Sequence, residues 1–447
     1  MKQSAKKKSL DHAFWAKFAQ NYWERKPAIF SGITSPILNI DSDHIFQLLV
    51  RYSEHCRQTN TTEGMKFYID GQPQYFEDVL RYLPVPRDRS LTGYHRRMSQ
   101  QFKDYCLVCD ELLQVSQEKW DLLGNFMLDL YQEVGFPNRY AEIGLYLGNY
   151  RKTPFGVHVD GCGVFSFPVV GTKRFRLWDP RIVKKHPDLE ESHHYAPYKK
   201  QSQLLQANPG DMTYWPSSYW HIAESNGSFS ATWSLGVWVN EPFQETLAEM
   251  LKPFLPKMLS KDADHRMVTF RQIHDGTGRI HQLPELFERS IAILSALPER
   301  ELKDLALKFW LARTSKKGFK NPPLLPPEER LTPKDQVRAK SEHPILWAQL
   351  SQGLLCLAVN GKLIELPESK AVSKLIQDLN SGRAFALAAS SPDEKQILHR
   401  LYELNALKKL ENRKLDLATP VSGMKQKRSP KAKLSTPARN KKTERKP

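Results

Sequence analysis

The stretch His158-Val159-Asp160 is followed by a second histidine, His221, which lies 61 residues after the aspartate. Valine and the aromatic residues near both segments favour β-strands. Residues i and i+2 of an extended strand point to the same face, so we expect His158 and Asp160 to grip one ion together. His221 is then expected to reach the same ion from a second, facing strand.

Two imidazoles and one carboxylate on one side of an ion form the facial triad that is typical of non-haem Fe(II) oxygenases. A lone histidine on a strand is more often a core residue than a ligand, but two features favour a ligand here. Asp160 is predicted on an inward face, where an unpaired carboxylate is costly. Lys173 lies 15 residues after His158, and a buried ammonium there needs an anion, such as a dicarboxylate co-substrate.

Short runs of β-forming residues, separated by glycine and proline, begin at Ala141 and are typical of an antiparallel sandwich or barrel. The expected strands are 141–150, 155–160, 163–169, 173–178, 204–206, 212–215, 219–224 and 229–239. A polar insertion at 181–203 contains His186, His193 and His194, and we interpret it as a surface loop in preference to a lid. His193 and His194 are weak rival ligands, because neighbouring residues on a strand face opposite ways.

Helical and mixed segments flank these strands. An amphipathic helix that leads into a short strand is expected in 11–33, and further helices are expected near 42–57, 115–134, 245–260, 284–296 and 298–313. The last part of the chain predicts a strand, a hairpin at Asn360-Gly361, a helix (369–379), a strand (383–388) and a helix that opens at Ser391. This order is typical of a winged-helix-like module.

Positive charge is concentrated at the two ends of the chain. Residues 1–10 and 411–447 together hold +13 of the formal net charge of +17. Such ends suit a polyanion such as RNA or a ribosome, and solvated disordered tails are the alternative. No apolar run reaches the roughly 18 residues that a membrane span needs, so we expect a cytoplasmic protein with no membrane contact.

The five cysteines are an odd number and are scattered along the chain. Cys106 and Cys109 form a C-x-x-C pair, but a structural zinc site needs a second ligand pair and none is visible. We expect both to be core residues in a helical, apolar stretch. Cys162 follows Asp160 by two residues and is expected to line the pocket without acting as a nucleophile.

The chain resembles the JmjC-type, cupin-fold 2-oxoglutarate oxygenases, and most closely their ribosomal oxygenase branch, which hydroxylates residues of ribosomal proteins. The resemblance is carried by the His-Val-Asp segment with His221, by the strand GTKRFRLWDP (171–180) and by the approach GDMTYWPSSYWH (210–221). The WERKP segment (23–27) resembles the family's entry to the barrel. The resemblance is strong over 141–240, weaker over 11–40 and mainly architectural over 245–410, whereas 41–140 shows no motif.

This resemblance implies three iron ligands, namely His158, Asp160 and His221. It also implies 2-oxoglutarate as co-substrate, with Lys173 and Tyr146 at its distal carboxylate and Ser234 near its other end. Gly161-Cys162-Gly163 departs from the family, since relatives often carry bulkier polar residues there, and this predicts a different substrate pocket.

We therefore expect an α+β fold with a double-stranded β-helix (jelly-roll, cupin) JmjC core, flanking helices, a helical dimerisation region and a winged-helix-like C-terminal domain. The expected boundaries are a basic N-terminus (1–10), a catalytic domain (11–244, core 141–240), a helical dimerisation region (245–315), a linker (316–340), a winged-helix-like domain (341–410) and a basic tail (411–447).

The leading functional prediction is an Fe(II)- and 2-oxoglutarate-dependent oxygenase that hydroxylates a residue of a protein substrate, with ribosomal proteins as candidates. A hydroxylase of a small molecule or biosynthetic peptide is the alternative. Lysine demethylation ranks third, because no methyl-lysine cage is readable. A non-catalytic cupin-like scaffold that binds RNA or a ribosome is the alternative from another class, and a homodimer through 245–315 is expected.

Overall fold

The structure is a computed structural model that describes residues 8–34, 40–239, 241–253, 283, 285–323, 327, 329–340 and 344–410. The predictions for residues 1–7, for the end of the 245–260 helix and for the 411–447 tail lie outside the described residues. Among the described residues, no helix combines the length and the apolar character needed to cross a bilayer.

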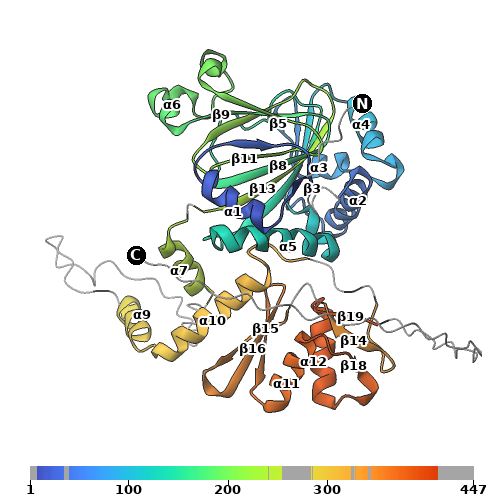
Figure 1. Cartoon of the computed structure of the whole chain (residues 1–447), viewed down its shortest axis with the longest axis vertical. Coiled ribbons are helices and arrows are strands. Elements are labelled where there is room, and N and C mark those ends of the chain that lie inside the picture. Colours follow the sequence, from blue (N-terminus) through green and yellow to red (C-terminus); the bar gives the residue numbers. More distant parts are fainter. Residues whose placement is uncertain are drawn as a thin grey trace, which may run out of the picture. The chain divides into compact units, whose positions relative to one another are not determined.

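Two antiparallel sheets face each other and form the centre of the fold (Figure 1). In spatial order, the larger sheet contains β2 (Ala28–Phe30), β11 (Met212–Trp215), β8 (Cys162–Val170), β13 (Ser230–Trp238), β7 (Ala141–Gly148), β6 (Tyr105–Cys109), β4 (Met65–Ile69) and β5 (Gln72–Pro73). The smaller sheet contains β10 (Gln203–Ala207), β9 (Lys173–Trp178) and β12 (Trp220–Glu224). These sheets and their flanking helices confirm the predicted cupin-like architecture.

The larger sheet has one face against helices and the other toward the smaller sheet, as the two-residue period of a strand allows. On β8, Phe165 and Phe167 lie in the helix-covered core, whereas Val164 lines the interior between the sheets. The covering helices are α1 (His12–Asn21), α2 (Ser42–Thr59) and α5 (Gln117–Val134). Helices α1 and α5 pack side by side under the sheet (Figure 1), and Trp15 of α1 touches both Phe126 and Phe165.

The strand predictions for 141–239 are confirmed with one exception, and their ends differ from the structure by at most two residues. The exception is 155–160, which is a loop in which His158 forms an isolated β-bridge with His221. Two further predictions need correction. Cys106 and Cys109 lie on strand β6 and not on a helix, and 181–203 contains helix α6 (Pro180–Lys185) and two short 3₁₀ turns.

Further helices and short strands precede the C-terminal module. They are β1 (Lys8–Ser9), β3 (Ile33–Thr34), α3 (Phe76–Tyr82), α4 (Leu91–Ser99), α7 (Phe243–Leu251), α9 (Glu285–Ser295) and α10 (Glu299–Ser315). Within the predicted linker, Phe319 is buried and its backbone pairs with Ala141 of β7. A dimerisation role for the helices remains a prediction.

The C-terminal module has its own apolar core. Its elements are β14 (Gln336–Ala339), β15 (Leu346–Leu350), β16 (Leu354–Val359), β17 (Lys362–Pro367), α11 (Lys370–Asn380), β18 (Phe385–Ala386), α12 (Pro392–Glu403) and β19 (Leu407–Lys409). The predicted hairpin at Asn360-Gly361 is confirmed, with Asn360 in the left-handed region at φ 48°. Ser391 and Glu394 form the predicted capping box. The winged-helix identity of this module remains a prediction.

Candidate metal centre

The loop that carries His158 and Asp160 is held against β12, the strand that carries His221. The amide of His158 donates to the carbonyl oxygen of His221 at 3.0 Å, and the amide of His221 donates back at 2.7 Å. The two histidines are therefore directly opposite each other, although only one of them lies on a regular strand. Their imidazole centroids are 4.3 Å apart.

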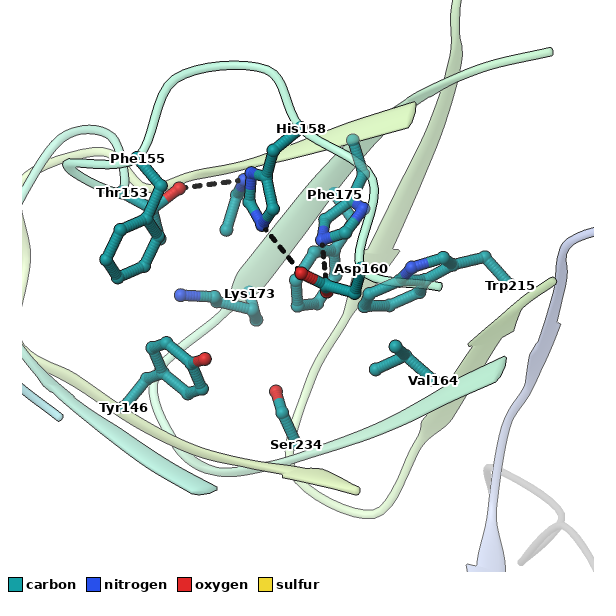
Figure 2. A pocket seen from close by; sticks show the side chains of 12 residues that line it. Tyr146, Thr153, Phe155, His158, Asp160, Val164, Lys173, Phe175, Trp215 and Ser234 are labelled. Atoms are coloured by element: carbon teal, nitrogen blue, oxygen red, sulfur yellow. Dashed lines mark hydrogen bonds and ion pairs between the residues drawn. The ribbon is translucent and has the colours of Figure 1, made fainter. Parts of the chain in front are cut away.

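Three side chains converge on one point between the sheets. The Nε2 atom of His158 lies 3.3 Å from Asp160 Oδ1, and the Nε2 atom of His221 lies 3.3 Å from Asp160 Oδ2. One potential ligand atom from each residue falls within 4.8 Å of the others. Figure 2 shows His158 and Asp160 on the loop at the edge of the cavity, with their polar atoms turned toward each other. His193 and His194, the rival ligands, are exposed and lie outside this group.

Both imidazoles are oriented in the same way by the backbone. His158 Nδ1 lies 3.1 Å from the carbonyl oxygen of Gly156, and His221 Nδ1 lies 3.4 Å from that of Tyr219. A carbonyl oxygen only accepts, so each Nδ1 carries the proton and each Nε2 presents a lone pair. Metal-binding histidines are usually fixed by such a bond at the second ring nitrogen. The donor set therefore fits a divalent metal of the Fe(II) type.

The charges of the three residues are coupled. Burial raises the pKa of Asp160, but the two histidines outweigh this effect and hold the pKa well below its ordinary value. Burial lowers the pKa of His158, but the hydrogen bond and charge of Asp160 raise it above its ordinary value. Burial and the charge of His158 lower the pKa of His221. The carboxylate is thus ionised, as a metal ligand must be.

The triad lies at the edge of a cavity between the two sheets. Its lining residues are Tyr146, Thr153, Phe155, His158, Asp160, Val164, Lys173, Phe175, Trp215, His221, Ala223 and Ser234. Half of these side chains are apolar or aromatic, and the other half are polar or charged. The structure therefore brings every predicted site residue to one cavity.

Lys173 extends from β9 into this cavity and is only 1% exposed (Figure 2). Burial lowers the pKa of its ammonium to about 8. Its Nζ donates to the hydroxyl of Tyr150, and it also lies over the rings of Tyr150 and Phe175, at 4.5 and 5.7 Å from their centroids. None of the ion pairs among the described residues includes Lys173, so its charge is left for an anion in the cavity.

The other two predicted co-substrate residues also line the cavity. Tyr146 lies on β7 with its ring 5.9 Å from Lys173 Nζ, and Ser234 lies on β13, directly across from Gly144 in the sheet register. Figure 2 shows Tyr146 and Ser234 projecting from the strands opposite Lys173. Their predicted roles toward 2-oxoglutarate remain predictions.

Sequence reasoning missed Tyr150 and Trp215. Tyr150 follows Tyr146 by four residues, a spacing that places both on one side of an extended chain, and this spacing was the available signal. Trp215 lies 4.9 Å from the His221 ring, and its buried indole N–H has no hydrogen-bond partner among the residues that the structure describes. Cys162 is buried beside Gly236 but does not line the cavity, contrary to the expectation.

Residues 129–245 match the family model of the JmjC domain, which confirms the predicted resemblance for the barrel segment. A comparison with curated proteins gave no match. Among solved structures, the chain is similar to the Escherichia coli ribosomal oxygenase YcfD in complex with cobalt and 2-oxoglutarate, with 14% identity and a TM-score of 0.47 over 88% of this chain and 98% of that chain. It is similar to YcfD in complex with cobalt and succinic acid, with 15% identity and a TM-score of 0.46 over 88% and 98% of the two chains.

Proposed function

We propose that the chain is an Fe(II)- and 2-oxoglutarate-dependent oxygenase that hydroxylates a residue of a protein substrate. One observation carries the proposal: a two-histidine, one-carboxylate donor set and a buried lysine line the same cavity, and this lysine has no ion-pair partner in the described part of the chain. The first fits a ferrous ion with open positions, and the second fits the far carboxylate of a dicarboxylic acid. The JmjC match over 129–245 supports the same conclusion.

His158, Asp160 and His221 would hold the metal, which supplies oxygen activation when 2-oxoglutarate is bound beside it. The role of Lys173 is to orient the co-substrate by its far carboxylate, and Tyr146 and Ser234 would add hydrogen bonds. Aromatic side chains exclude water from the reacting atoms. The mechanism requires no general base.

Turnover of 2-oxoglutarate to succinate in the presence of Fe(II) tests the proposal. The wild type is expected to form succinate, and His158→Ala is expected to lose this activity together with metal binding. His194→Ala is the matched control, because His194 is an exposed histidine outside the triad, and it should keep wild-type activity. Absence of iron-dependent succinate formation in the wild type would reject the oxygenase and favour a non-catalytic scaffold.

For the substrate, we propose a protein with ribosomal proteins as first candidates. The proposal is supported by the resemblance of the sequence to ribosomal oxygenases and by the basic ends, which suit a ribosome or RNA. Mass spectrometry of host ribosomal proteins, with and without this gene, should reveal a peptide that gains one oxygen. If every ribosomal protein is unchanged and succinate still forms, a small molecule or biosynthetic peptide becomes the leading substrate class.

We also propose that the chain forms a homodimer through its helical region. Helices α7, α9 and α10 expose large apolar side chains, namely Phe243, Leu247, Phe287, Ile291, Leu294, Leu307 and Trp310. Exposed apolar patches of this kind usually mark protein contacts. Light scattering should give twice the chain mass of 51.7 kDa, and a monomer at micromolar concentration would reject the dimer.

A further inference from the structure

The insertion between β9 and β10 is built into the core, and the part of it that concerns the metal centre is the strip 186–195. Its residues Leu189 and Tyr195 are buried at 0% and 3% exposure. They pack in one apolar cluster with Val157, Trp178 and Ile222. A lid that opens has few buried contacts, so this strip is a fixed part of the fold and not a lid.

Two strands of the smaller sheet anchor the strip. The hydroxyl of Tyr195 donates to Glu224 Oε1 at 2.7 Å, and Glu224 also accepts from Arg176 Nε at 2.8 Å. Glu224 lies on β12, three residues after His221, and Arg176 lies on β9. The strip is therefore tied to the strand that carries one of the metal ligands.

The strip also grips the loop that carries the other histidine. The amide of Val157 donates to the carbonyl oxygen of Ser192 at 3.1 Å, and the amide of Glu191 donates to the carbonyl oxygen of Val157 at 2.8 Å. The next residue, His158, uses both of its own backbone groups with His221. The strip therefore holds Val157, and β12 holds His158. These two sets of backbone hydrogen bonds fix the path of the loop.

Close approach of the two backbones requires a glycine at position 156. Gly156 has φ +71°, and a Cβ atom there would lie 2.6 Å from the carbonyl oxygen of Glu191. Glu191 itself is in the left-handed region at φ 53°. Such conformations persist only where the surrounding structure enforces them. Here the two residues, Gly156 and Glu191, lie against each other where the loop meets the strip.

We propose that the strip 186–195 is a positioning element of the metal centre that acts through the Gly156 carbonyl group. This carbonyl oxygen accepts the Nδ1–H bond of His158, so the strip fixes the direction in which Nε2 points. The inference rests on the proposed metal centre, and it assigns a role to a segment that does not line the cavity.

Co(II) is a suitable probe, because its visible spectrum and its affinity can be measured without turnover. Leu189→Ala removes a buried anchor of the strip, and Leu379→Ala removes an equally buried leucine from the separate C-terminal core. Both variants should lose stability, but only Leu189→Ala should bind Co(II) about 10- to 100-fold more weakly, the usual effect of losing support for a metal ligand. Equal Co(II) affinity in Leu189→Ala and wild type would overturn the proposal.

A backbone variant keeps the test decisive if Leu189→Ala does not fold. Gly156→Ala introduces the 2.6 Å clash with Glu191, whereas Gly382→Ala places a Cβ in open space at a similar φ of +85°. Gly156→Ala should alter the Co(II) spectrum and weaken binding, and Gly382→Ala should do neither. An unaltered spectrum in Gly156→Ala would overturn the proposal. A wild type that binds no Co(II) would reject the metal centre itself, which is a separate failure.

Discussion

Replacement of Lys173 by methionine is expected to stabilise the ligand-free protein and to weaken co-substrate binding. The ammonium is 1% exposed, and the pKa of Lys173 is lowered to about 8 because burial disfavours the charged form. Methionine keeps most of the length of the side chain and removes the charge. Residues that serve a site often reduce stability in this way.

The size of the stability gain follows from the pKa of Lys173. The fall from 10.5 to about 8 corresponds to about 3 kcal/mol, because each pKa unit is worth about 1.4 kcal/mol. This cost is full below pH 8 and disappears as the pH rises toward 10.5, where the unfolded lysine also loses its proton. The lost hydrogen bond to Tyr150 returns about 1 kcal/mol, so the expected net gain at pH 7 is about 2 kcal/mol.

The loss of co-substrate affinity is expected to be larger than the gain in stability. Removing one partner of a buried ion pair costs about 3–5 kcal/mol, which is a weakening of roughly 10²- to 10⁴-fold in the binding of 2-oxoglutarate. Urea unfolding of the ligand-free protein and 2-oxoglutarate titration in the presence of Co(II) measure the two effects. The exposed Lys199→Met is the control, with neither effect expected. Lys173→Met that unfolds at lower urea than wild type at pH 7, or that binds 2-oxoglutarate normally, would refute the reasoning.

Three further results are expected. Co(II) affinity should fall as the pH decreases, and the fall should begin above pH 6.5, because Asp160 raises the pKa of His158 above that value and the metal needs the neutral imidazole. Calorimetry at pH 6, 7 and 8 measures the Co(II) affinity, and an affinity that does not change with pH would contradict the prediction. Glu24→Gln should reduce the free energy of unfolding by about 1–3 kcal/mol, because the Glu24 carboxylate accepts hydrogen bonds from both the amide and the hydroxyl of Ser217. The control Glu118→Gln, at a side chain that is 81% exposed, should leave the free energy of unfolding nearly unchanged. Deletion of 411–447 removes nine net positive charges and should weaken salt-dependent binding to ribosomal RNA, whereas succinate formation should be retained. Unchanged RNA binding would contradict the assignment of the RNA contact to this tail.

The strands of the barrel could be predicted because local sequence determines them. Alternating apolar residues and glycine or proline punctuation mark β8, β9, β11 and β13 closely. The loop around His158 could not be predicted in this way, because valines on both sides of the histidine favour a strand. Its backbone partners are Ser192 and His221, and such long-range pairing leaves no trace in the local pattern. The convergence of the triad was predicted correctly from an incorrect local structure.

The cavity wall was predictable where one residue has a charge that must be compensated. Lys173 and Asp160 stand out in the sequence because neither can be buried alone. Tyr150 was missed because a tyrosine can be buried as part of any core, and its hydroxyl accepts from Lys173 only once the fold brings the two side chains together. The insertion was read as a surface loop because its sequence is polar. Only Leu189 and Tyr195 of the strip are buried apolar anchors, and two residues are too few to show a periodic apolar pattern in the sequence.

The two histidines reach equivalent positions by different means, and this difference locates the weak point of the centre. His221 lies on β12, and the Tyr219 carbonyl group that orients it directly precedes this strand. His158 lies on a loop, so the corresponding Gly156 carbonyl group depends on contacts from outside the barrel. Substitutions that loosen those contacts should therefore misalign His158 before they affect His221. A partly disrupted centre should retain the Asp160–His221 pair and lose metal through His158, and the sensitivity of metal binding should extend to residues that never touch the cavity.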